Sequence, residues 1–301
     1  MIRFKQYLFK ILKNLKFLPK PLFLKIRYTA YIGKDIDFEN PLDFNQKITW
    51  YKLYYHPPIL TLLADKYAVR SYVENKIGKE YLNELYGYYN HINQIDFDCL
   101  PNQFIIKAAH GSHKTILVTD KSNLDISKTK KTLQKWLKYN HYKKVGFEWA
   151  YKNIKPGIVI EKYLKEGDQR FPIDYKFNCF DGKVKFIQVA KEENGVRRGR
   201  YYDQNFIQQE YLRKNHIGFN FEIEKPILFE KMKEIAEILA DRFPFVRVDL
   251  YLVDQKIIFG EMTFYPGDAK YDFVPEKYNK ILGDYFKLPS LNGQKEITIY
   301  E

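Results

Sequence analysis

The stretch FVRVDLYLVDQKIIFGEMTFYPG, residues 245–267, has the pattern of two apolar strands joined by a short turn. Arg247, Asp249 and Glu261 nevertheless lie inside these strands. Because side chains alternate between the two faces of a strand, Arg247 and Asp249 share one face, and Glu261 shares a face with Thr263. Charged side chains within a sheet need partners or water, so the hairpin indicates a cleft or a solvent-facing side of the sheet.

Asp249 and Glu261 lie side by side only if the hairpin pairs residues whose numbers sum to an even value. That requires a loop of odd length, such as Val253-Asp254-Gln255 ending in a bulge, with Gln255 where glycine is easier. Two carboxylates held so close repel each other unless a cation or a proton intervenes, and such oxygen ligands suit Mg²⁺. The alternative is that both carboxylates pair with Arg247 and neighbouring lysines.

The composition describes a folded protein with anionic partners. Of the 301 residues, 45% are apolar and 17% aromatic, which argues against disorder. Cys99 and Cys179 provide neither a disulfide framework nor a zinc set, and they suit a reducing cytoplasm. No apolar run approaches the ~20 residues of a membrane span. The net charge of +13 favours nucleic acid, anionic lipid, nucleotide or acidic glycan as partners.

The N-terminal 34 residues are a separate basic segment. Nine lysines and arginines precede Asp35, the first acidic residue. Apolar residues recur at helical spacing up to Pro19, namely Phe4, Leu8, Ile11, Leu15 and Leu18. One interpretation is an interfacial helix on anionic lipid, which would make the protein peripheral at the inner membrane face. The other is a helix packed on the protein body with its lysines solvated.

The rest of the chain mixes helical and strand-like segments. Helical periodicity covers residues 41–76, 125–141 and 226–242, with Pro226 in the first turn of the last helix. Asp181-Gly182 between two strand-like runs predicts a hairpin. Hairpins mixed with helices predict an α+β fold of two lobes. Besides the opening hairpin, strands are predicted at residues 104–109, 115–118, 157–164, 173–180 and 183–190.

With these segments in view, the chain resembles an ATP-grasp enzyme of the teichuronopeptide-biosynthesis type found among surface-polysaccharide genes. The resemblance covers roughly residues 41–289. It implies an ATP-grasp fold, in which two lobes with mixed or antiparallel sheets clasp ATP, and it rests on FNQKITWYKLY, LADKYAVRSYV, LPNQFIIKAAHGS, IVIEKYL, DYKFNCFDGKVKFIQV and the opening stretch. We expect the basic segment at 1–34, the helices and first lobe at 35–160, and the second lobe with hinge and metal site at 161–301.

The resemblance assigns nucleotide-binding roles to single residues. It implies that Lys107 contacts the phosphates, and that Lys66 and Arg70 form an earlier basic pair near phosphate and the acid substrate. It implies that the loop HGSHKT, residues 110–115, covers the phosphates, although Gly111 is its only glycine; Ser112 and backbone amides would cradle phosphate.

The same resemblance places adenosine along the hinge strand IVIEKYL. Glu161 would meet the adenine amino group, and the backbone of Lys162 and Leu164 would contact the ring edge. Asp168, with Glu166 as second choice, would accept the ribose hydroxyls.

The reacting end is assigned to the opening hairpin and the strand before it. Arg247, Lys176 and Lys107 would stabilise the transferring phosphoryl group. Mg²⁺ would be held by Asp249 and Glu261. The wider superfamily commonly has Asn two residues beyond the glutamate, whereas this chain has Thr263, a poorer ligand.

Each of these patterns also has an ordinary structural interpretation. Lys66 and Arg70, one turn apart on a predicted helix, would also suit a solvated helix face. Residues 189–206 are either an acceptor-binding loop or a flexible surface loop, and they carry Arg197, Arg198 and Arg200. Three polar residues of one predicted strand lie on the same face, namely Asp174, Lys176 and Asn178. They either line the cleft or form cross-strand ion pairs.

The resemblance implies an ADP-forming carboxylate–amine ligase that works through an acyl phosphate. Its acid substrate would be a uronic acid of a surface polysaccharide or its precursor, and its amine an amino acid, a polyamine or an amino alcohol. The alternatives are another glycan-modifying enzyme, a transferase or kinase, or a nucleic-acid-binding protein. No RNP-like strand, helix-turn-helix or zinc spacing supports the last alternative, so we expect no nucleic acid partner.

Overall fold

A computed structural model of the chain describes residues 18–144, 146–167, 169–193, 195–214, 216–219 and 222–300. Most of the predicted N-terminal amphipathic helix therefore lies outside the described residues. Within the described part, no helix has both the length and the apolar character needed to cross a membrane.

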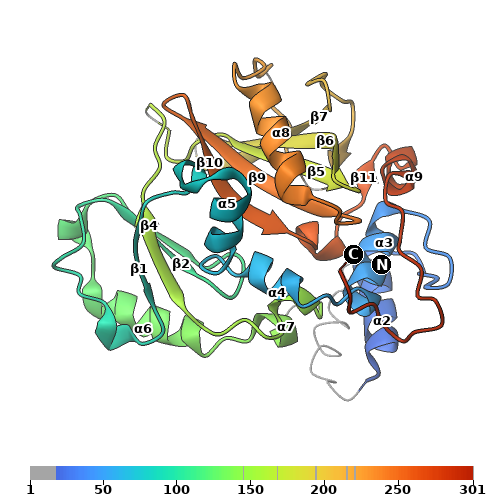
Figure 1. Cartoon of the computed structure of the whole chain (residues 1–301), viewed down its shortest axis with the longest axis horizontal. Helices are drawn as coiled ribbons and strands as arrows, with labels where there is room; N and C mark the ends of the chain where they lie inside the picture. Colours follow the sequence, from blue (N-terminus) through green and yellow to red (C-terminus); the bar gives the residue numbers. More distant parts are fainter. Residues whose placement is uncertain are drawn as a thin grey trace.

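The first lobe is a four-stranded antiparallel sheet with one helix beneath it (Figure 1). The strand order is β1-β4-β2-β3, and the strands are β1 (Leu85–Tyr89), β2 (Phe104–Ala108), β3 (Thr115–Val118) and β4 (Ile158–Lys162). Helix α6 (Ile126–Leu137) begins after Asp125, whose side chain accepts a hydrogen bond from the Lys128 amide at 2.8 Å. Leu133 of α6 then packs into the core formed by the buried residues of the sheet.

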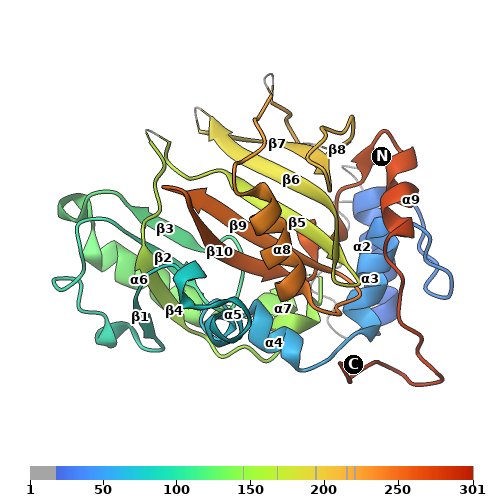
Figure 2. The same ribbon diagram turned by 45° about the horizontal axis from the view of Figure 1, so that its top comes forward.

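The second lobe is a five-stranded antiparallel sheet with the order β10-β9-β5-β6-β7. Its strands are β5 (Asp174–Phe180), β6 (Lys183–Glu193), β7 (Val196–Asp203), β9 (Val246–Val253) and β10 (Lys256–Thr263). A two-stranded ribbon of β8 (Leu212–Arg213) and β11 (Phe273–Val274) accompanies it. Figure 2 shows the two large sheets on either side of α5 and α4.

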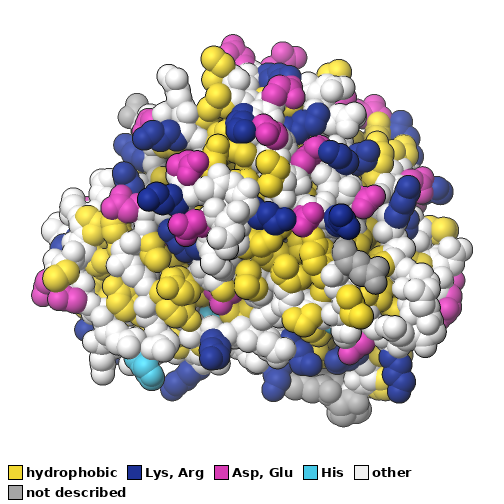
Figure 3. Space-filling view, viewed as in Figure 1, with side chains coloured by type: hydrophobic (Ala, Val, Ile, Leu, Met, Phe, Trp, Pro, Cys, Tyr) yellow, Lys and Arg dark blue, Asp and Glu magenta, His cyan; other side chains and the backbone are white. Residues whose placement is uncertain are grey.

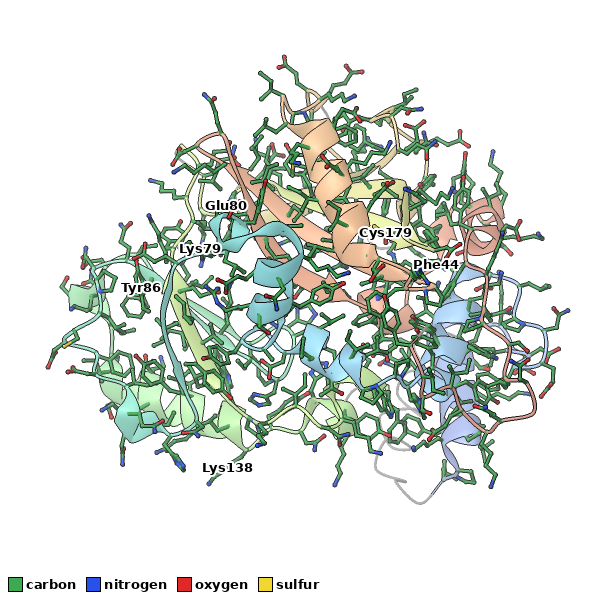
Figure 4. The ribbon with its side chains drawn as sticks, viewed as in Figure 1. Phe44, Lys79, Glu80, Tyr86, Lys138 and Cys179 are labelled. Carbon is green, nitrogen blue, oxygen red and sulfur yellow. The ribbon has the colours of Figure 1, made fainter. Side chains whose placement is uncertain are left out.

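Helix α8 (Phe229–Ala240) covers one face of the second sheet, above β5. Cys179 of β5 lies beneath this helix (Figure 4), with its Sγ 3.8 Å from the Ala236 carbonyl oxygen. Every residue of β5 is buried. Since side chains alternate along a strand, Lys176 and Asn178 must face away from α8, into the interior of the molecule.

The remaining helices lie beside the sheets, and Figure 1 shows α2, α3 and α9 together at one end of the molecule. Phe44 at the start of α3 stacks edge-on against Phe180, Phe245 and Phe273, which anchors this end to the second sheet (Figure 4). The helices are α2 (Lys20–Ile32), α3 (Phe44–Tyr54), α4 (Ile59–Ala64), α5 (Val69–Ile77), α7 (His141–Lys144) and α9 (Lys277–Asp284). Short 3₁₀ turns are η1 (Lys79–Tyr81), η2 (Ile92–Gln94), η3 (Lys121–Asn123), η4 (Trp149–Tyr151) and η5 (Pro266–Ala269).

Lysine, arginine and acidic side chains are interspersed on the face seen in Figure 3, over the part of the molecule where α8 lies. The surface over this helix is therefore mixed in charge and does not form a continuous basic patch.

Two helix predictions need correction. The helical region expected at 41–76 is three helices, α3, α4 and α5, because Pro57 and Pro58 cannot continue α3 and a turn separates α4 from α5. Pro226 lies in a turn before α8, where its carbonyl oxygen accepts the Phe229 amide at 2.9 Å, and the helix begins only at Phe229.

The predicted strands are all present, and the Asp181-Gly182 hairpin is confirmed. Both turn residues have positive φ, 48° and 69°, as a two-residue type I′ turn requires. The β9–β10 loop is also two residues long, Asp254-Gln255, with φ of 49° and 60°. The expected odd-length loop is therefore wrong.

The expected pairing of Asp249 with Glu261 is nevertheless correct, because a β-bulge further along the hairpin shifts the register. Phe259 pairs with Leu250, but Glu261 pairs with Asp249, so Gly260 is the extra residue. A Cβ at Gly260 would lie 3.0 Å from the Asp249 carbonyl oxygen, which explains the glycine. The bulge turns Glu261 onto the face that carries Asp249.

A buried carboxylate joins α2 and α3 to the loop that follows β10. Asp268 has a left-handed φ of 56° and forms ion pairs with Arg27 of α2, Lys52 of α3 and Lys270, the last at 2.9 Å. Burial would raise the pKa of Asp268, but the three cations outweigh burial and lower it. The loop after β10 is thereby fixed to the N-terminal helices.

The two type I′ turns give a matched test of backbone strain. Gln255 has the left-handed backbone conformation, which is strained for a residue with a Cβ. Gln255→Gly removes this strain and should raise the free energy of unfolding by about 0.5–1 kcal/mol. Gly182→Gln at the equivalent position should lower it by more than that gain, since its Cβ would also meet the Asp241 carbonyl oxygen at 2.0 Å. Urea unfolding measures both, and equal effects of the same sign would contradict the assignment of these turns.

Candidate active site

A row of polar side chains crosses the second sheet on the face turned away from α8. The register places Glu261 opposite Asp249, Asp249 opposite Lys176, Lys176 opposite Gln188, and Gln188 opposite Tyr201. Directly opposed residues of antiparallel strands share a face, so the row runs across five strands from β10 to β7. The row contains both predicted Mg²⁺ carboxylates and one predicted catalytic lysine.

Arg247 is the centre of the hydrogen bonds at the metal end of this row. Its Nε donates to Asp249 Oδ1 at 2.6 Å and its Nη2 to Asp249 Oδ2 at 2.7 Å. The same Nη2 lies 3.1 Å from Glu261 Oε1 and 3.2 Å from Thr263 Oγ1. The Thr263 hydroxyl donates in turn to Glu261 Oε1 at 3.0 Å. One guanidinium thus contacts all three predicted metal ligands.

Lys176 links this cluster to a second carboxylate. Its Nζ forms ion pairs with Asp249 and with Asp174 Oδ2, the latter at 2.6 Å. Asp174 Oδ2 also accepts from Arg197 Nη2 at 2.5 Å. Ion pairing is thus found for Asp174 and Lys176, whereas Asn178 Nδ2 donates to the Lys176 carbonyl oxygen at 3.2 Å.

The two metal-ligand carboxylates differ electrostatically. Burial would raise the pKa of Glu261, but Lys66, Arg247 and Lys176 outweigh it and lower the pKa to about 2. Burial raises the pKa of Asp249 even though Arg247 and Lys176 act in the opposite direction, because Asp174 and Glu261 add negative charge nearby. Glu261 is therefore firmly ionised at neutral pH.

The first lobe supplies a second group of charges facing this one. Glu161 of β4 accepts from Lys107 Nζ at 2.8 Å and lies 3.3 Å from Arg70 Nη1. Arg70 Nη2 also donates to the Asn83 carbonyl oxygen at 2.9 Å. The carboxylate that was expected at the adenine amino group is thus occupied by two predicted phosphate ligands.

Lys66 connects the two lobes. It lies in the turn between α4 and α5, not on one helix with Arg70, so the solvated-face interpretation does not apply to it. Its Nζ donates to the Gly111 carbonyl oxygen at 2.8 Å and lies 3.9 Å from Glu261 Oε2. Gly111 belongs to the loop between β2 and β3, which also contains Ser112, so Lys66 ties the predicted phosphate loop to the metal strand.

A cavity of about 260 Å³ opens between the two lobes beside these charges. Apolar side chains that could enclose a flat ring are contributed by Ile105, Tyr163, Leu164, Phe171 and Pro172. Polar side chains at its edge are Asn83, Lys107, Thr115, Lys162, Asp174, Arg197 and Tyr251. Of the predicted nucleotide ligands, Lys107, Lys162 and Leu164 line this cavity, and Asp168 lies outside the described residues.

The arginine-rich segment 189–206 is not a flexible loop. Its described residues belong largely to the β6–β7 hairpin, and of its three arginines Arg197 lines the cavity. Arg198 donates to the Gly218 carbonyl oxygen, and Arg200 donates twice to the Phe219 carbonyl oxygen.

Gln188 and Tyr201 of the polar row were missed by the sequence analysis. Counting from the Asp181-Gly182 turn would pair Lys176 with residue 187. A bulge between Asn178 and Cys179 moves the partner to Gln188. Nothing in the sequence marks that bulge, because no glycine accompanies it.

The chain is similar to several solved ligase and synthetase structures. D-alanine–D-alanine ligase from Bacillus anthracis matches with 19% identity and a TM-score of 0.47, over 76% of this chain and 68% of that one. The N5-carboxyaminoimidazole ribonucleotide synthetase purK matches with 13% identity and a TM-score of 0.42, over 80% of this chain and 56% of that one. The ATP-grasp ligase PsnB matches with 11% identity and a TM-score of 0.41, over 77% and 62% of the two chains. No curated protein matches the chain.

Helices and antiparallel sheets form two lobes, the architecture expected of an ATP-grasp fold. The family model for TupA-like ATP-grasp proteins matches residues 46–287, and the chain therefore belongs to that family. The resemblance inferred from the sequence motifs is confirmed.

The lowered pKa of Glu261 predicts a specific pH dependence of stability. A carboxylate with a folded-state pKa near 2 and an ordinary value of 4.5 contributes stability above pH 4.5, and this contribution is lost as the pH falls toward 2. Glu261→Gln lacks this contribution. The difference in urea unfolding free energy between wild type and variant should therefore shrink between pH 5 and pH 3, and a constant difference would contradict it.

Proposed function

We propose that this protein is a Mg²⁺- and ATP-dependent ligase that joins a carboxylate to an amine through an acyl phosphate. The observation that carries the proposal is the Arg247 cluster beside the interlobe cavity. Two carboxylates and a hydroxyl lie on adjacent strands, close to Lys66 and Lys176, and Lys107 lines the cavity.

Several cations proposed to bind phosphate are already paired with carboxylates. Lys107 and Arg70 share Glu161, Arg247 and Lys176 share Asp249, and Lys66 approaches Glu261. Mg-ATP contains a cation that can bind the carboxylates, and phosphates that can bind the lysines and arginines. Its binding would therefore exchange partners: Asp249 and Glu261 would hold the metal, and the freed cations would hold the phosphates.

The donor set suits a hard divalent ion. Asp249 and Glu261 offer carboxylate oxygens and Thr263 a weaker hydroxyl oxygen, which is the chemistry Mg²⁺ prefers when phosphate completes its coordination. When bound, Mg²⁺ would neutralise charge between the phosphates. Arg247, Lys176 and Lys107 would supply fixed positive charge for phosphoryl transfer, a reaction that depends on positioning and electrostatics.

Activation of the acid explains why ATP is needed. Hydroxide is a poor leaving group, so a carboxylate does not accept an amine in water. Transfer of the γ-phosphoryl group to the carboxylate gives an acyl phosphate, from which the amine displaces inorganic phosphate. The chain's side chains bind and orient the reactants, and none has to act as a covalent nucleophile.

The acid substrate that we propose is a uronic acid of a bacterial surface polysaccharide or its precursor. The family membership and the net charge of +13 support an acidic glycan. We place the enzyme in the cytoplasm, with peripheral contact to anionic lipid through the basic segment 1–34.

Release of ADP and phosphate should require acid and amine together. With a uronic acid and an amine, wild type should release both products, and omission of either substrate should abolish steady release. Asp249→Asn and Glu261→Gln should each reduce kcat/KM at least ~100-fold, because each removes a charge that holds the metal. Glu230→Gln on α8 is the matched control. It removes only an exposed ion pair with Lys225, so the variant should retain activity.

A kinase would release ADP without an amine, and a sugar transferase would consume a nucleotide sugar. Either result would replace the ligase proposal.

Partner exchange also predicts that nucleotide and metal bind together. Mg-ATP at ~100 times its dissociation constant should stabilise the fold by roughly 2.7 kcal/mol. Mg²⁺ alone should give no comparable rise in melting temperature, since Arg247 and Lys176 occupy Asp249 until phosphate receives them. A full shift with Mg²⁺ alone would contradict the exchange.

A further inference from the structure

Helix α6 and the residue that caps its C-terminus carry a row of exposed lysines. The four residues, which we call the lysine stripe, are Lys128, Lys131, Lys135 and Lys138. An α-helix turns by about 100° per residue, so these positions fall within roughly 80° of one another and span about 15 Å along the axis. Leu133 lies on the opposite side of the helix and packs into the core of the first sheet. The lysine stripe therefore faces solvent.

No acidic side chain neutralises the lysine stripe. The helix itself contains no Asp or Glu, and within the part of the chain that the structure describes no carboxylate forms an ion pair with any of the four lysines. Like charges three and four residues apart on a helix repel each other. An anion at this face would relieve that repulsion without first having to displace a carboxylate of the protein.

Exposed lysines elsewhere in the protein do have acidic partners. The ion pairs include Lys183 with Glu237, Lys225 with Glu230, Lys231 with Glu234 and Lys280 with Asp284. The unpaired charges of α6 are thus a local property of this helix, and they do not simply follow from the positive net charge of the chain.

The lysine stripe lies on the same edge of the molecule as the beginning of α2. Figure 1 shows α6, α7 and the first turn of α2 along the lower edge. Lys138 points outward at this edge (Figure 4). Lys20, the first residue of α2, is also exposed, and the sequence before it, residues 1–17, has five lysines and arginines and no acidic residue. Two basic parts of the chain, distant in sequence, therefore meet at one edge.

This edge is separated from the interlobe cavity by the first sheet. Ile105 and Lys107 of β2 line the cavity, whereas Ile106 between them points to the other face and packs in the core that contains Leu133 of α6. A large partner bound to the lysine stripe would thus leave the cavity open.

The chemistry of the lysine stripe fits an anionic lipid surface. Clusters of four to eight basic residues on a helix are attracted to anionic headgroups, and each lysine adds to the attraction. The stripe contains no arginine for bidentate recognition of a single phosphate, and no aromatic ring on which a base could stack. A planar surface can also contact α6 and the start of α2 together, although they belong to different parts of the molecule.

We propose that the lysine stripe of α6 binds the surface of an anionic membrane, as a second contact beside the basic segment 1–34. The two contacts together orient the protein with its first sheet between the lipid and the cavity. This inference goes beyond the ligase function, and its test requires no turnover.

The test measures the partition of the full-length protein onto lipid vesicles. Wild type should bind vesicles of equimolar phosphatidylglycerol and phosphatidylcholine, and should not bind vesicles of phosphatidylcholine alone. Replacement of all four lysines of the stripe by Gln should weaken the binding by on the order of 100- to 1,000-fold. Gln is a good helix former and removes the like-charge repulsion, so the urea midpoint of this variant should not fall.

The matched control removes the same number of charges from lysines that have acidic partners. It combines Lys183→Gln, Lys225→Gln, Lys231→Gln and Lys280→Gln, and it should bind the anionic vesicles nearly as wild type does. If both fourfold variants lose binding equally, only net charge matters and the inference is wrong. Binding of wild type to neutral vesicles as tight as to anionic ones also overturns it.

A third variant separates α6 from the basic segment 1–34. It replaces Lys5, Lys10, Lys13 and Lys16 by Gln. If this variant loses vesicle binding while the α6 variant binds as wild type does, the peripheral location stands and the role of the lysine stripe is wrong. Duplex DNA and polygalacturonate test the other polyanions. If either binds wild type more tightly than the vesicles do, and the α6 variant loses that binding, the partner is not lipid and the inference is overturned.

Discussion

The Arg247–Asp249 ion pair shows the main constraint on the site. Charges held between the two lobes cost free energy unless opposite charges neutralise them, and here the protein's own side chains do so. Nε and Nη2 of Arg247 contact both oxygens of Asp249, and Lys176 contacts the same carboxylate. The first lobe repeats the arrangement with Glu161 between Lys107 and Arg70. Lys66 joins the two groups through Glu261 and the Gly111 carbonyl oxygen. Nucleotide, metal and protein charges therefore have to be considered as one set.

Local sequence patterns predicted the strands, because alternation and turn residues act over a few positions. They did not predict register. The β5–β6 and β9–β10 hairpins of the second sheet each begin with a two-residue turn and are then shifted by a bulge, one after Asn178 and one at Gly260. The predicted pairing of Asp249 with Glu261 is correct, but a bulge produces it and not an odd-length loop. The position of Gln188 opposite Lys176 was not predicted. A bulge is selected by packing across the sheet, which a single strand's sequence does not encode.

Contacts between distant segments were also beyond prediction. Asp268 pairs with Arg27 and Lys52, which lie 241 and 216 residues away. The sequence pattern and the family resemblance pointed to Arg247, Asp249 and Glu261, whereas the partners of each charge had to be located from its three-dimensional environment.

The ion pairs of the cleft also bear on how the proposed reaction cycle would end. If the cleft binds ATP as proposed, loss of the γ-phosphoryl group would leave fewer oxygens for Lys107, Lys176 and Arg247. Glu161 and Asp249 would then compete for these cations on better terms. The internal pairs would weaken nucleotide binding but favour the release of ADP, so the same contacts that lower affinity would speed turnover.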